Sequence, residues 1–152
     1  MINHKSLPIA NVFEKKPVFN QISFSKNIIF WIDIVKKGET YRNSIFARPF
    51  NQPQSESQKL TGDEFNLKSN FHGYGGKSYQ CIEVNEKIYL VWIDQFSESL
   101  WIQIFRLNES KTKNNNKYLL CETKPIQLVK PSKGNFDSSF VITNENTLLG
   151  LY

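Results

Sequence analysis

The sequence predicts an all-β protein, and two observations support that expectation. Short apolar runs and stretches of alternating apolar and polar residues dominate the chain, whereas helical periodicity is nearly absent. Aromatic residues make up 14% of the 152 residues, with 12 Phe, and flat or β-branched side chains pack well on a pleated surface. A chain of this length can bury one hydrophobic core.

The expected strands follow one another with short polar connections. In the first half they cover residues 27–35, 43–50 and 58–61, with a turn at 36–40. In the second half they cover 77–84, 87–94, 100–107, 118–121 and 125–129, and residues 136–143 pair with 147–152 as a hairpin. A tight Asn85-Glu86 turn joins the strands at 77–84 and 87–94, and a polar segment of low complexity separates 107 from 118.

One tripeptide occurs twice in this pattern. Trp31-Ile32-Asp33 and Trp92-Ile93-Asp94 lie 92 − 31 = 61 positions apart, and each belongs to an apolar run followed by a polar turn and a second apolar run. A period of about 60 residues with about four short antiparallel strands is typical of a β-propeller blade with long loops. The repeat also predicts that Asp33 and Asp94 cap equivalent turns, and that Trp31, Trp92 and Trp101 belong to the core between blades.

The predicted architecture is therefore about two and a half antiparallel four-stranded blades of an incomplete propeller. We expect an N-terminal arm at 1–18 and a partial propeller at 19–152, with a first blade at 19–62, a second at 63–130 and the start of a third at 131–152. Propellers close with four to eight blades, and the chain stops inside an apolar stretch. We expect either a fragment of a longer chain or a module that covers its open faces by association.

Charge and cysteine content narrow the classes of function. The net charge is +5 and the sequence pI is about 9.2, but the lysines are scattered over expected loops without a nucleic-acid-binding motif. No apolar run of about 18 residues predicts a membrane span, and no signal peptide precedes the first strand, so we expect a cytoplasmic protein. Cys81 and Cys121 have no metal-binding spacing and are expected to be buried free thiols.

The most specific local signal is the glycine segment at 71–79, which reads FHGYGGKSY. Three of the chain's 7 glycines fall within four positions there, and glycine serves where the backbone needs positive φ or a close approach. Aromatic side chains around them supply packing anchors. The Gly-Lys-Ser ending is not a phosphate loop, because Phe71 stands where that motif needs glycine and no helix follows.

At this segment the chain resembles the N-terminal propeller of the prolyl oligopeptidase family of serine peptidases, closest to its bacterial acylaminoacyl-peptidase-like branch. That branch carries LT, a short FNVRS-like stretch, HEYGGG and a strand pair. The matching text here is Leu60-Thr61, 65–69, 72–77, and the strands around Ile88-Tyr89-Leu90 and Leu100-Trp101. Residues 19–34 stand in the place of the first propeller strand. The resemblance covers nearly the whole chain from about Leu7, and the glycine segment is its one specific motif.

The resemblance implies a propeller that covers an α/β-hydrolase domain and filters access of peptide substrates to a Ser-Asp-His triad. The chain has no G-x-S-x-G nucleophile elbow and only two histidines, His4 and His72. We therefore expect no catalytic residue, metal site or cofactor. The implied partners are the missing blades and the hydrolase domain, or a second copy, with no nucleic acid and no membrane.

The residues that carry the family motif are His72, Tyr74, Gly75 and Gly76. We expect His72 to hydrogen-bond to backbone and Tyr74 to act as a packing anchor, with a structural role and a place on the substrate side of the propeller. Two departures from the motif matter: Gly73 stands where the family has Glu, and Lys77 where it has a third Gly. If that Glu makes a polar contact near substrate in the family, the resemblance implies that this chain has lost the contact.

Two other functions remain open at this stage. A free-standing β-rich binding module that works through self-association or a protein partner accounts for the aromatic richness and the unfinished strand edge. A nucleic-acid-binding β-barrel accounts for the pI and the aromatics, although no basic residues are interleaved with the tryptophans as a stacking platform requires.

Overall fold

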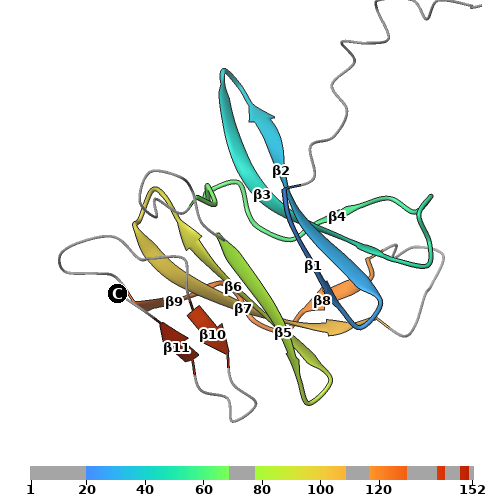
Figure 1. Cartoon of the computed structure of the whole chain (residues 1–152). Coiled ribbons are helices and arrows are strands. Elements are labelled where there is room, and N and C mark those ends of the chain that lie inside the picture. The colour runs from blue at the N-terminus through green and yellow to red at the C-terminus, as the bar shows by residue number, and fades with distance from the viewer. Residues whose placement is uncertain (1–19, 69–77, 109–116, 130–139, 143–147, 151–152) are drawn as a thin grey trace, which may run out of the picture.

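The computed structural model describes residues 20–68, 78–108, 117–129, 140–142 and 148–150, and the structural statements below concern these residues (Figure 1). They contain strands and turns and no helix. The strands form a four-stranded sheet, a five-stranded sheet and a two-stranded hairpin, and every pairing between them is antiparallel.

The first sheet, sheet 1, is a simple meander in the order β1-β2-β3-β4. Its strands are β1 (Asn20–Ser25), β2 (Ile28–Lys37), β3 (Thr40–Pro49) and β4 (Gln58–Lys59). Lys26 and Asn27 join β1 to β2 with φ of 44° and 59°. A two-residue turn with positive φ at both positions matches the twist of the two strands that it connects. Gly38, with φ of 60°, turns β2 into β3. The described residues 20–34 thus belong to two paired strands rather than to the single strand that the resemblance implied for 19–34.

The second sheet, sheet 2, has the same meander, but two short strands share the position of its fourth strand. Its strands are β5 (Tyr79–Val84), β6 (Lys87–Asp94), β7 (Ser99–Leu107), β8 (Leu119–Cys121) and β9 (Ile126–Val129). Asn85 and Glu86 make the expected tight turn, with φ of 48° and 64°. β8 and β9 both pair with β7, at its opposite ends, and between them Thr123 Oγ1 accepts a hydrogen bond of 3.1 Å from the Ile104 amide. They therefore share the place of one outer strand.

A third unit begins with the hairpin of β10 (Phe140–Ile142) and β11 (Leu148–Gly150), and β10 lies next to β5. Two four-stranded units followed by a hairpin confirm the predicted fold class, an all-β, antiparallel array of about two and a half blades that is not closed. The N-terminal arm at 1–18 lies outside the described residues.

The two sheets pack face to face through one hydrophobic core. Fully buried side chains from β2, β3, β5, β6 and β7 meet there: Phe30, Ile45, Tyr79, Ile88, Leu90, Trp92 and Phe105. Sheet 2 carries a second apolar cluster on its opposite face, built on Val91, Ile93 and Leu100. Because alternate residues of a strand point to opposite faces, sheet 2 is apolar on both sides, as an interior blade of a stack must be.

The repeated tripeptide is not a structural repeat, which corrects the expectation from the sequence. The core positions of sheet 1 recur in sheet 2 at an interval of 88 − 28 = 60, since Ile28 and Ile88 both face the core between the sheets. The tripeptide recurs at 61, and a shift of one residue moves a side chain to the opposite face of its strand. Trp92 therefore enters the core between the sheets. Trp31 is also buried, at 4% exposed, but on the outer face of sheet 1, where it stacks on Phe46 at 6.0 Å between ring centroids.

The aspartates of the tripeptide differ for the same reason. Asp94 ends β6 and holds the following turn, as expected. Asp33 lies inside β2 opposite Ser44, and its carboxylate accepts a hydrogen bond only from the adjacent amide of Ile34 among the contacts recorded for the described chain, at 2.7 Å. Asp33 therefore caps no turn, and the predicted equivalence of the two aspartates is wrong.

The first strands of the two sheets are tied together by a buried polar cluster. The Tyr79 hydroxyl donates to the Gln21 carbonyl at 2.5 Å and lies 2.9 Å from Ser23 Oγ, which donates to it. The Ser78 amide donates to Gln21 Oε1 at 2.5 Å. Ser23 Oγ also lies 3.2 Å from Cys81 Sγ. The two cysteines are not joined in a disulfide. The predicted burial holds only in part for Cys81, which is half-buried, and is wrong for Cys121, which is exposed because β8 is an edge strand.

The buried phenol of Tyr79 is expected to make the folded state less stable at alkaline pH. Burial raises the pKa of its phenol above the usual value of 10.0, so the folded state holds this proton more tightly than the unfolded state. Its contribution is complete below about pH 10 and declines as pH rises further, by about 1.4 kcal/mol per pH unit. We expect the stability difference between the wild-type chain and Tyr79→Phe, measured by urea unfolding, to shrink between pH 9 and pH 11.5. A difference that is constant over this range contradicts the assignment.

Candidate functional site

The residues singled out by the sequence, His72, Tyr74, Gly75 and Gly76, lie outside the described residues. Both flanks of their segment are described and meet at one place. Leu67 forms a β-bridge with Asp94, and the Ile93 amide donates to the Ser78 carbonyl at 2.9 Å. The described residues on either side of the glycine segment therefore lie beside the end of β6.

A buried carboxylate organises that end of β6. Asp94 is 2% exposed, and its Oδ1 accepts a hydrogen bond of 2.8 Å from the Asn66 amide. Its Oδ2 accepts from the Ser97 amide at 2.9 Å and from Ser97 Oγ at 2.7 Å. Ser97 Oγ in turn accepts a hydrogen bond of 3.0 Å from Trp101 Nε1. Asp94 thus fixes a loop, a turn and an indole ring at once.

An aromatic pocket opens beside this network, with a volume of about 530 Å³. Phe65, Phe96 and Trp101 supply its aromatic lining, and Glu64 and Lys124 lie among its charged residues. Phe65 contacts Trp101 edge-to-face at 5.1 Å and Trp92 at 5.2 Å. Volumes of this size and predominantly apolar linings are typical of sites for small molecules.

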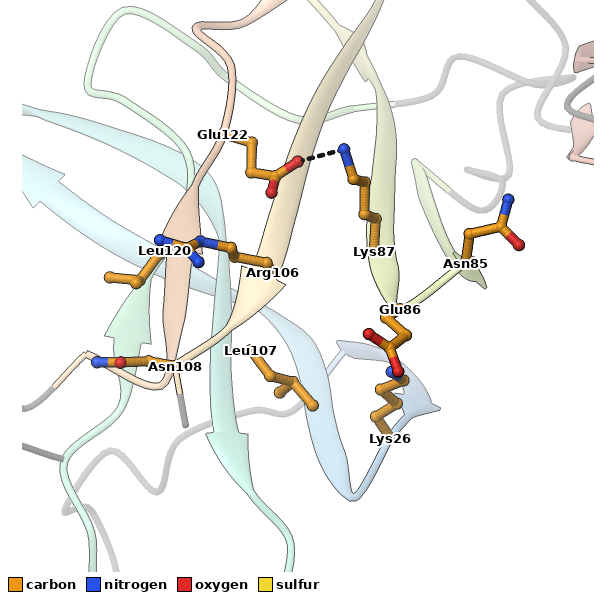
Figure 2. A pocket seen from close by; sticks show the side chains of 9 residues that line it. All are labelled: Lys26, Asn85, Glu86, Lys87, Arg106, Leu107, Asn108, Leu120 and Glu122. Atoms are coloured by element: carbon orange, nitrogen blue, oxygen red, sulfur yellow. Dashed lines mark ion pairs between the residues drawn. The ribbon is translucent and has the colours of Figure 1, made fainter. Parts of the chain in front are cut away.

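A polar groove of about 510 Å³ lies where the β1–β2 and β5–β6 turns meet β7 and β8 (Figure 2). Three cations, Lys26, Lys87 and Arg106, line it, and two of them are paired with carboxylates within the fold. Lys87 pairs with Glu122 at 2.8 Å, which raises the pKa of the lysine, and Lys26 pairs with Glu83 at 3.1 Å. Such pairs at a wet surface contribute little, and the groove offers no concentrated charge to an ionic ligand.

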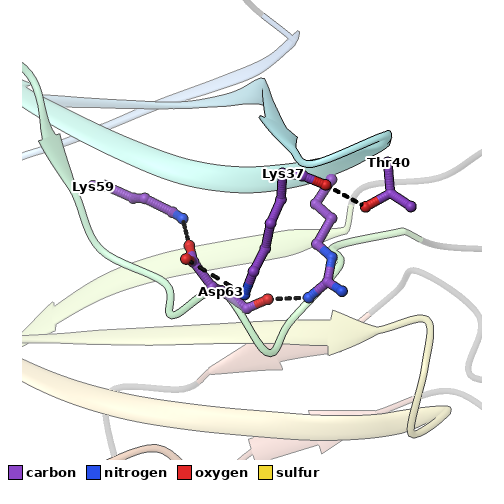
Figure 3. Close-up of polar contacts among 5 residues, drawn as sticks. Lys37, Thr40, Lys59 and Asp63 are labelled. Carbon is purple, nitrogen blue, oxygen red and sulfur yellow. Dashed lines mark hydrogen bonds and ion pairs between the residues drawn. The ribbon is translucent and has the colours of Figure 1, made fainter.

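A third polar feature surrounds Asp63 (Figure 3). Its carboxylate pairs with Lys59 and, at 3.5 Å, with Lys37, while its backbone carbonyl accepts a hydrogen bond from Arg42. The hydrogen bond from Lys59 and the charges of both lysines lower the pKa of the Asp63 carboxyl. The carboxylate is exposed, and we assign it a structural role, because its contacts tie the β2–β3 hairpin to the loop after β4.

No group of three or more His, Cys, Asp and Glu side chains suited to a metal ion occurs within the described ranges. No described helix is long and apolar enough to cross a membrane. Comparison with known protein families, with curated proteins and with solved structures found no match to this chain.

Reasoning from the sequence missed the aromatic pocket because its walls come from three separate segments. Phe65 lies in the loop after β4, Phe96 in the β6–β7 turn, and Lys124 between β8 and β9. One signal was present: Phe96 is a large apolar residue inside a polar turn, where the chain has no local reason to place it.

Proposed function

We propose that this chain forms the N-terminal part of the propeller of a prolyl-oligopeptidase-like serine hydrolase. In that role it is a structural wall that limits access to a catalytic domain and carries no catalytic residue itself. The observation that supports the proposal best is the pair of successive four-stranded meanders packed face to face, with sheet 2 apolar on both faces. The family-like glycine segment at 71–79 supports it from the sequence.

The outer face of sheet 1 carries exposed aromatic residues, as expected for a face that contacts another blade. In a closed propeller that face packs against another blade. Phe24 and Phe50 remain 61% and 64% exposed, with their rings edge-to-face at 5.7 Å. A paired, exposed aromatic surface of this kind marks a contact with another protein element. The hydrolase domain, the peptide substrate and the cytoplasmic location all belong to this proposal.

The reading frame that follows Tyr152 in the genome tests the proposal. We expect it to encode further repeats of four short strands and then a G-x-S-x-G elbow followed by Asp and His. A frame that ends at Tyr152, with no such sequence downstream, would remove the support for a parent hydrolase.

A second candidate is a binding module that self-associates through the Phe24–Phe50 surface, favoured by the exposure of those rings. Light scattering separates the two. A discrete oligomer that Phe24→Glu converts to a monomer supports the module, because the buried ring would become a buried charge. A wild-type monomer, or aggregation without a defined stoichiometry, supports the propeller part. The matched control is Tyr41→Glu, at another exposed aromatic residue.

A further inference from the structure

We propose that the aromatic pocket beside Asp94 binds a small quaternary ammonium compound. The inference rests on the pocket alone and is independent of the proposed hydrolase. Its ligand is an organic cation with methyl or methylene groups around the nitrogen. Three features support it: the aromatic lining, the packing that holds two of its rings in place, and an exposed carboxylate at its rim.

Aromatic rings supply much of the apolar lining. Phe65, Phe96 and Trp101 all line the pocket, and an aromatic face attracts a cation within about 6 Å of its centroid. Phe96 shows this attraction within the fold, since the Arg42 guanidinium lies over its ring at 5.0 Å from the centroid. The pocket therefore has the surface chemistry that recognises weakly hydrated cations.

The rings are held in place before a ligand arrives. Trp101 is fixed through Ser97 to the buried carboxylate of Asp94, and Phe65 is 5% exposed and wedged against Trp92 and Trp101. A site whose side chains are already ordered loses less conformational entropy on binding. Phe96 is 58% exposed, so one wall remains accessible from solvent.

The lining offers one carboxylate to a ligand cation. It contains two carboxylates, Glu64 and Asp94, and one ammonium group, Lys124, and the Arg42 guanidinium over Phe96 balances the remaining negative charge. The side chains of Glu64 and Lys124 make no ion pair with any described residue. Glu64 is therefore available to a ligand cation, and Lys124 opposes it.

A quaternary ammonium group fits better than a primary one. A primary ammonium has three donors to satisfy, and both oxygens of Asp94 already accept hydrogen bonds from Asn66 and Ser97. Glu64 is then the one carboxylate left for those donors, and a primary ammonium would lose hydration without replacing it. A quaternary ammonium group has no donors and loses less on entry.

Choline, ethanolamine and 3,3-dimethylbutan-1-ol test these points as matched probes at low ionic strength. The first carries the quaternary charge, the second a primary ammonium, and the third is the neutral isostere of choline. Dissociation constants come from the shift of the Trp101 indole N–H resonance, assigned with Trp101→Phe. We expect choline to bind most tightly and to shift this resonance selectively. Equal binding of the neutral alcohol, or no shift with choline, overturns the proposal.

Two charge variants then test the site itself. Glu64→Gln should weaken choline binding about two- to fivefold, the size of a solvent-exposed ion pair, and Lys124→Gln should strengthen it. Both residues are on the surface, so the fold is kept and an unchanged thermal midpoint verifies this. Glu86→Gln, in the turn at the opposite end of β6, is the matched control and should leave binding unchanged. Equal effects of Glu64→Gln and Glu86→Gln also overturn the proposal.

Discussion

Replacing Trp92 with alanine is expected to lower the free energy of unfolding by about 3–5 kcal/mol, the largest effect of any single substitution considered. Trp92 is 0% exposed at the centre of the core between the sheets, and its ring packs edge-to-face on Phe65 at 5.2 Å. The truncation removes the transfer free energy of the indole and leaves a cavity that two rigid sheets cannot close. Urea unfolding at neutral pH measures the loss.

Two further variants keep this prediction testable. Trp92→Phe retains most of the ring and should cost less than Trp92→Ala, so it remains measurable if the alanine variant fails to fold. Phe96→Ala removes a ring of the same sheet that is 58% exposed, and it should change stability by no more than about 0.5 kcal/mol. Similar losses for Trp92→Phe and Phe96→Ala would show that Trp92 does not lie in the core.

Replacing Asp94 with alanine is expected to cost about 2–4 kcal/mol, because buried donors lose a charged acceptor. The substitution leaves the amides of Asn66 and Ser97 and the hydroxyl of Ser97 without the oxygens that they bind now. Hydrogen exchange of the Asn66 and Ser97 amides should accelerate together with the loss of stability.

Asp33→Ala is the control for this prediction, since both residues end the same tripeptide. Asp33 is half-exposed, and the one hydrogen bond recorded for its carboxylate comes from the next residue in the chain. We expect Asp33→Ala to change stability by less than about 0.5 kcal/mol. Equal losses at Asp33 and Asp94 would restore the equivalence that the sequence predicted and contradict the face assignment argued above.

Secondary structure was largely predictable because it depends on neighbouring residues. The strand at 87–94 was predicted with the bounds that the structure has, and the Asn85-Glu86 turn was recognised. The strand at 20–25 was missed, because the two-residue turn at Lys26-Asn27 contains no glycine and interrupts the apolar pattern only briefly. Asn27 is the one local signal for this turn, because Asn adopts the left-handed backbone region more readily than most residues.

The candidate site was less predictable than the strands. The sequence directed attention to the glycine segment, whose residues carry a motif that can be recognised in one dimension. The aromatic pocket draws on residues 64–65, 94–101 and 124–125, and no short motif joins them. Its assembly follows from the pairing of β6 with β7 and from the way the loop after β4 folds back onto Asp94.

The sequence by itself determined the fold class, the antiparallel order and the number of blade units, since side-chain alternation and turn residues are local properties. The tertiary structure alone decided which face each strand buries. The sequence pattern does not distinguish a repeat interval of 60 residues from one of 61. A shift of one residue nevertheless moves every side chain of a strand to the opposite face of its sheet. For that reason Trp92 and Asp94 support the core and the pocket, whereas Trp31 and Asp33 lie on the outer face of sheet 1, where Trp31 is buried against Phe46.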